Sequence, residues 1–191
     1  MTSTKLESMS YTVSEALKEM LSALMTSELS ALKKISDRCI SSFALEEQPD
    51  LLEVAITSYV LAKVLEKPRY WDKKIKREFV ERVQESLQNA ISSLDENRPE
   101  DMRAYLKSIE DDLKAFDTED RRYIGSLFHK ARLRFASYLY AQGFSLSNAI
   151  ALTGTSKSDV LDYSGKTLMH DRVGKTKSIE ERLKNVRKIF Q

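Results

Sequence analysis

Glycine and proline are scarce in this chain, and their scarcity limits what it can fold into. The 191 residues contain five glycines and three prolines, whereas average usage is about 7% and about 5%. A sandwich or barrel of many short strands needs both residues at its frequent turns, and a phosphate-binding loop needs clustered glycines. Collagen-like chains and disordered chains rich in these residues are excluded too. A chain of helices joined by polar turns remains, so we expect an all-α protein.

The two residue types and the charges are segregated along the chain. All three prolines lie before residue 100 and all five glycines lie after it. Residues 1–120 hold 17 Lys and Arg against 24 Asp and Glu, a balance of −7, and residues 121–191 hold 14 against 5, a balance of +9. We therefore predict two domains, an acidic N-terminal helical bundle over residues 1–116 and a basic module over residues 117–191. Such a split hints at nucleic acid or an acidic partner; the alternative is that the two parts pack against each other within one fold.

Capping signals and apolar spacing predict about eight helices. Thr12 and Glu15 have the spacing of a capping box, and the apolar pattern that follows breaks near residues 26 and 27. Pro49 and Pro99 fit the first position of a helix, where the missing N–H costs nothing. Gly143 fits the left-handed residue that ends many helices. The apolar stripes between these signals are interpreted as core.

Further predictions for the N-terminal half concern the helix that begins at Pro49 and the start of the helix after it. The helix that begins at Pro49 is expected to bury Leu52, Ile56, Tyr59 and Val60 and to stop before Pro68. Trp71 is expected to begin the next helix.

The single cysteine, Cys39, excludes an internal disulfide framework and fits a reducing compartment. It lies on an apolar helical stripe, so we expect a small buried side chain rather than a reactive thiol. The sequence has no apolar run of the roughly 18 residues that a membrane span needs, and residues 1–11 lack the apolar stretch of a signal peptide. We expect a soluble, cytoplasmic protein with no membrane partner.

Residues 143–165 predict two short helices joined by a tight turn. Ser145 caps the first helix, Gly154 ends it, and Ser156 starts a second helix that is expected to stop at Gly165. This is the layout of a helix-turn-helix, whose second helix can enter the major groove. Three residues match positions of that layout. Ile150 falls where the layout has a small or apolar residue, and Gly154 falls at its tight turn. Val160 falls where an apolar residue holds the second helix in place.

The segment resembles the helix-turn-helix superfamily, and more loosely short motifs of uncharacterised prokaryotic regulators and antitoxins. The phrase that carries this resemblance is Ser145-Leu146-Ser147-Asn148-Ala149, followed by Leu152, Gly154 and Ser156. The resemblance covers residues 143–165 only and implies a helix-turn-helix-like module with Lys157 and Ser158 nearest the bases. Asp159 and Asp162 on the second helix would face phosphates. A helix-turn-helix that serves protein contacts is therefore the alternative.

The helix before this module carries small and basic residues at spacings of 3, 4, 3 and 4, which share one face: Arg122, Gly125, His129, Arg132 and Ala136. A phosphate backbone could approach such a stripe, with counterion release supplying affinity; the alternative is an ordinary solvated face. The region that follows adds further candidate phosphate contacts: Lys166, Arg172, Lys175 and Lys177.

Nothing in the sequence carries a catalytic signature. Gly165-Lys166-Thr167 and Gly174-Lys175-Thr176 look like the end of a phosphate-binding loop, but the glycine that the loop needs five residues earlier is Val160 in one case and Met169 in the other. Two histidines and one cysteine make no usual zinc set, and the Gly-x-Ser-x-Gly phrase is missing. We expect no enzyme, no metal and no cofactor; a polar pocket holding several carboxylates would revive the enzyme class.

From these observations we predict a nucleic-acid-binding protein in a regulatory or accessory role, and we expect the nucleic acid to be DNA. The alternative is a helical scaffold or adaptor, such as an antitoxin-like protein, that binds protein without nucleic acid. A last amphipathic helix carrying Ile179, Leu183, Val186 and Phe190 would dock on its own chain or on a second copy. A homodimer would suit a reader of two half-sites.

Overall fold

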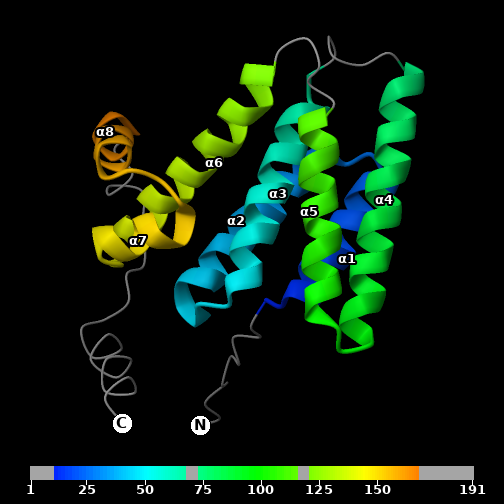
Figure 1. Ribbon diagram of the computed structural model, residues 1–191, viewed down its shortest axis with the longest axis horizontal. Helices are drawn as coiled ribbons and strands as arrows, with labels where there is room; N and C mark the ends of the chain where they lie inside the picture. The colour runs from blue at the N-terminus through cyan, green and yellow to red at the C-terminus, as the bar shows by residue number, and fades with distance from the viewer. Residues whose placement is uncertain (1–10, 68–72, 116–120, 168–191) are drawn as a thin grey trace, which may run out of the picture. The chain divides into compact units, whose positions relative to one another are not determined.

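The computed structural model describes residues 11–67, 73–115 and 121–167, and these residues form eight α-helices (Figure 1). The all-α prediction is confirmed. The chain divides into two compact units, Met1–Arg121 and Arg122–Gln191, each of which is described by itself. Among the helices of the described residues, none combines the length and apolar content needed to cross a membrane.

The first unit contains α1 (Val13–Met25), α2 (Leu29–Glu46), α3 (Pro49–Leu65), α4 (Lys73–Asp95) and α5 (Pro99–Ala115). In space, α2 packs on α3, α3 on α5, α5 on α4, α4 on α1, and α1 on α2, so the five helices close into a ring; α1 also contacts α3 across it (Figure 1). Most of the largest fully buried side chains lie in this bundle, and they include Leu17, Phe43, Leu61, Phe79 and Ile109.

The helix starts and stops of this unit follow the local signals. The backbone N–H of Glu15 donates to Thr12 Oγ1 at 3.2 Å, and the N–H of Thr12 donates to Glu15 Oε2 at 2.8 Å, which completes the predicted capping box. The break near residues 26 and 27 is confirmed, because α1 ends at Met25 and Ser27 has a φ of 58°. Pro49 and Pro99 each begin a helix as predicted. The expectations for Pro68 and Trp71 lie outside the described residues.

Helix α3 is buried on almost every side. Eleven of its 17 residues are buried, and the helix contacts α1, α2 and α5. Leu52 and Val60 are buried as predicted. The prediction that Ile56 and Tyr59 are buried is wrong, because both lie with Glu53 on the narrow strip of α3 that stays open to solvent and are only half-buried. A helix that is apolar almost all round needs neighbours on most of its circumference.

Two serines join α2 to α3 inside the bundle. Ser36 Oγ on α2 donates to the carbonyl oxygen of Ala55 at 2.8 Å, and Ser58 Oγ on α3 donates to the carbonyl oxygen of Leu32 at 2.7 Å. Both serines are fully buried. Since each side chain is short and reaches the backbone of the other helix, the pair holds the two helices close together and satisfies its own buried hydroxyls.

Ser58 provides the first prediction. Ser58→Ala should lower the free energy of unfolding by about 1 kcal/mol through the lost hydrogen bond. Ser58→Leu should lower it by about 1–3 kcal/mol, since extra atoms must enter a packed contact. Urea unfolding followed by circular dichroism measures both changes. The matched control is Ser30→Ala at an exposed position of α2; equal midpoints for Ser58→Ala and Ser30→Ala would contradict a structural role for the hydroxyl.

Cys39 is fully buried in α2, as predicted. Burial is the largest influence on its thiol and raises the pKa to about 12. An unfolded thiol has an ordinary pKa of about 8.5. The proton held by the folded thiol therefore contributes stability that is complete below about pH 8.5 and is lost as the pH rises toward the folded pKa.

The native protein should consequently resist a thiol reagent such as dithionitrobenzoate at pH 8, because the thiolate is the reacting form and the side chain is enclosed. Labelling should reach one thiol per chain only in denaturant. Rapid stoichiometric labelling of the native protein would show that Cys39 is accessible. In Cys39→Ala, stability should fall less steeply between pH 9 and about pH 12 than in the unsubstituted protein.

Candidate nucleic-acid interface

The second unit contains α6 (Arg121–Ala141), α7 (Leu146–Thr153) and α8 (Lys157–Thr167), and a turn of only three residues separates α7 from α8. Gly154 occupies the left-handed region with φ 65° and ψ 34°, and its N–H donates to the carbonyl oxygen of Ile150 at 2.8 Å. Ser156 Oγ then accepts from the N–H of Asp159 at 3.2 Å. Ser145 caps α7 in the same way, at 3.1 Å. The predicted caps are confirmed.

A small apolar core joins the three helices. It consists of Leu133, Ala136 and Val160, with the partly buried Leu146, Ile150 and Tyr163 packed against it. Ile150 and Val160 therefore do the packing that the sequence assigned to them. The prediction that the second helix stops at Gly165 is wrong, because α8 continues to Thr167; a glycine within a helix is tolerated at a modest cost in backbone entropy.

Buried hydroxyls add a polar seam beside this core. The hydroxyls of Ser137 on α6 and Ser164 on α8 share a hydrogen bond of 2.7 Å. Thr153 Oγ1 donates to the carbonyl oxygen of Ala149 at 2.7 Å and lies 2.9 Å from the hydroxyl of Thr155. Every buried side-chain nitrogen or oxygen in the described part of the chain has a hydrogen-bond partner. The seam was not predicted, because isolated serines on apolar faces give no sequence signal beyond their spacing.

The predicted stripe on α6 lies partly against α8. Ala136 is fully buried in the core with Val160. His129 is exposed, and its Nε2 lies 3.9 Å from Asp159 Oδ2 on α8, a pair that is ionic only when the imidazole is protonated. Arg132 is half-buried. A phosphate near His129 would therefore be repelled by the carboxylate of Asp159. The sequence analysis assigned Asp159 to a different helix and did not predict that it would lie beside His129.

The remaining predicted site residues divide into two groups. Lys157 and Ser158 are exposed in the first turn of α8, as a contact with nucleic acid requires. The side chains of Arg122 and Lys166, and the whole of Arg172, Lys175 and Lys177, lie outside the described residues. Further along α8, Leu161 and Asp162 are exposed. Lys130, an exposed cation on α6 beside His129, was missed because it lies off the stripe.

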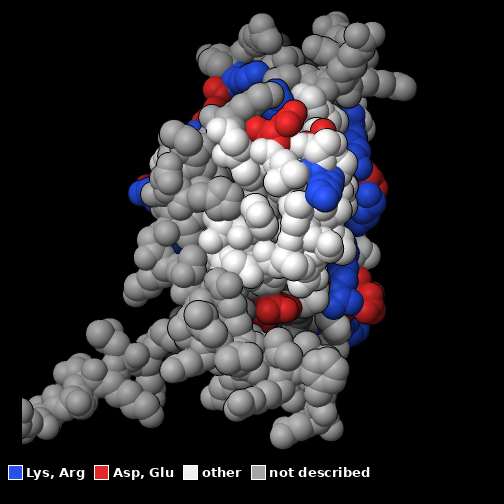
Figure 2. Space-filling view, turned by 90° about the vertical axis from the view of Figure 1, so that its left-hand side faces the viewer, with Lys and Arg blue, Asp and Glu red and all other residues white. Residues whose placement is uncertain are grey.

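The space-filling view shows one face of the molecule (Figure 2). The described atoms in the centre of this face are largely uncharged, and most of the Lys and Arg side chains lie toward its right-hand margin. The described residues in this view therefore form no continuous basic surface.

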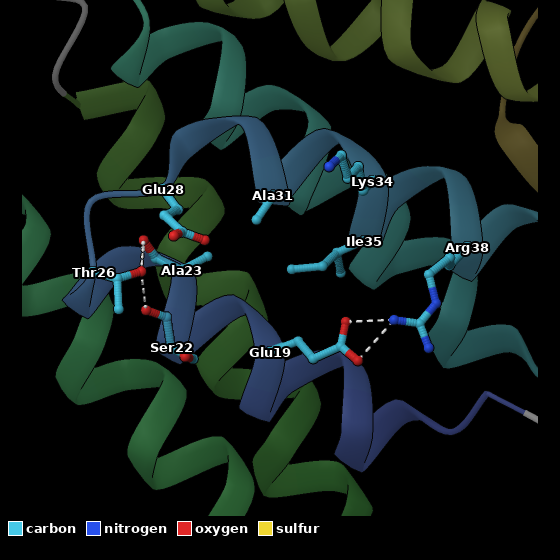
Figure 3. Close-up of a pocket in the computed structure, with 9 residues that line it drawn as sticks. All are labelled: Glu19, Ser22, Ala23, Thr26, Glu28, Ala31, Lys34, Ile35 and Arg38. Carbon is cyan, nitrogen blue, oxygen red and sulfur yellow. Dashed lines mark hydrogen bonds and ion pairs between the residues drawn. The ribbon is translucent and has the colours of Figure 1, made fainter.

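A groove of about 340 Å³ lies between α1 and α2 of the first unit (Figure 3), and its carboxylates are Glu19 and Glu28. Glu19 is held firmly: Arg38 Nη1 donates to both of its oxygens at 2.7 Å, and Tyr11 donates to Oε2 at 2.9 Å. The Arg38 guanidinium also lies 3.8 Å from the centre of the Tyr11 ring. Burial, followed by the hydrogen bond to Glu19, raises the pKa of Tyr11. This cluster joins Tyr11, which precedes the N-cap of α1, and Glu19 of α1 to Arg38 of α2.

Comparison with known proteins gives no assignment: the chain matches no protein-family model, no curated protein and no solved structure.

Substituting alanine for Gly154 and for Gly165 should change the stability of the second unit in opposite directions. Neither has an atom within 4 Å of an added Cβ, but Gly154 has φ 65° whereas Gly165 lies within α8. Gly154→Ala should destabilise the second unit by about 1 kcal/mol through backbone strain. Gly165→Ala should stabilise it by about 0.5–1 kcal/mol through reduced backbone entropy. Thermal unfolding of both variants is the measurement, and shifts of the same sign would contradict the turn geometry.

Proposed function

We propose that this chain is a nucleic-acid-binding protein in a regulatory or accessory role, and that its second unit binds duplex DNA. The observation that carries the proposal is the arrangement of α6, α7 and α8: two helices joined by a three-residue turn pack on a third. The first turn of the last helix is open, with Lys157 and Ser158 exposed. This is the layout of a helix-turn-helix, in which the N-terminal residues of the second helix contact base edges.

Charge supports the same proposal. Residues 121–191 carry 14 Lys and Arg against 5 Asp and Glu, so this region attracts a polyanion whatever its base sequence. The first turn of α8 adds backbone N–H groups and the positive end of the helix dipole, which favour a phosphate.

Most of the exposed face of α8 disfavours insertion of this helix deep into a groove. Beyond Lys157 and Ser158 it presents Leu161 and Asp162, and a carboxylate repels the phosphates that line a groove. Affinity would then come chiefly from Lys157, Arg132 and the cations that follow α8, with little sequence preference.

A second candidate function is that of a helical scaffold or adaptor that binds protein. It is favoured by two leucines, Leu152 on α7 and Leu161 on α8, which are exposed although large and apolar. Exposed apolar surface of this kind marks an interaction site when the residues form a patch.

A salt titration of binding to a fluorescent DNA duplex tests the nucleic-acid proposal. The logarithm of the affinity should fall linearly with the logarithm of salt concentration. Lys157→Glu and Arg132→Glu should each weaken binding about tenfold at low salt and reduce the salt slope by about 1. The matched control is Lys34→Glu, an exposed lysine of the first unit, which should leave binding unchanged.

Two outcomes would oppose the proposal. Absence of binding even at low salt would end it, and copurification of one stoichiometric protein without nucleic acid would then favour the adaptor. Equal losses in Lys157→Glu and Lys34→Glu would show that binding depends on overall charge rather than on the first turn of α8.

A further inference from the structure

We draw no further inference here: the strongest candidate, the groove between α1 and α2 that Glu28 and Lys34 line (Figure 3), carries nothing because Ala23 and Ile35 in its lining are already buried and nothing in the described part of the chain shows what would occupy it.

Discussion

The enclosure of α3 is the constraint on which the first unit depends. Its residues are apolar almost all round, and burial of apolar surface is the main favourable contribution to folding. Helices α1, α2 and α5 cover it, and α4 completes the ring by packing on α1 and α5. The most extensive of these contacts, between α2 and α3, includes Ser36 and Ser58, whose hydroxyls each reach a carbonyl oxygen of the other helix. Short side chains permit that approach, and their hydrogen bonds remove the cost of burying them.

The second unit is organised differently. Its core is small, and its geometry relies on the three-residue turn and on hydroxyl contacts such as Ser137–Ser164 between α6 and α8. A turn with Gly154 in the left-handed region sets the direction of α8, and the core residue Val160 then holds the helix against α6. This arrangement leaves the first turn of α8 and two leucines open. The two candidate functions of this unit, binding of duplex DNA and binding of protein, start from these open groups.

The candidate site could be predicted from the sequence only in part. Spacing placed His129, Arg132 and Ala136 on one face of α6, and that much is a property of helix geometry. Spacing did not show that α8 would cover the Ala136 end or bring Asp159 to within 3.9 Å of His129. The two residues are 30 positions apart, and their approach depends on how the turn and the core orient α8.

Most helix starts and stops were determined by the sequence itself, because caps act through hydrogen bonds and backbone angles within a few residues, although α8 continues through Gly165. Thr12, Pro49, Ser145 and Gly154 all perform the roles that local chemistry predicts. Tertiary structure alone decided which apolar residues are covered. Ile56 on α3 and Leu161 on α8 belong to apolar helical patterns yet remain partly open. Burial depends on neighbouring helices that are distant in the chain, and a periodic pattern carries no information about where those neighbours lie.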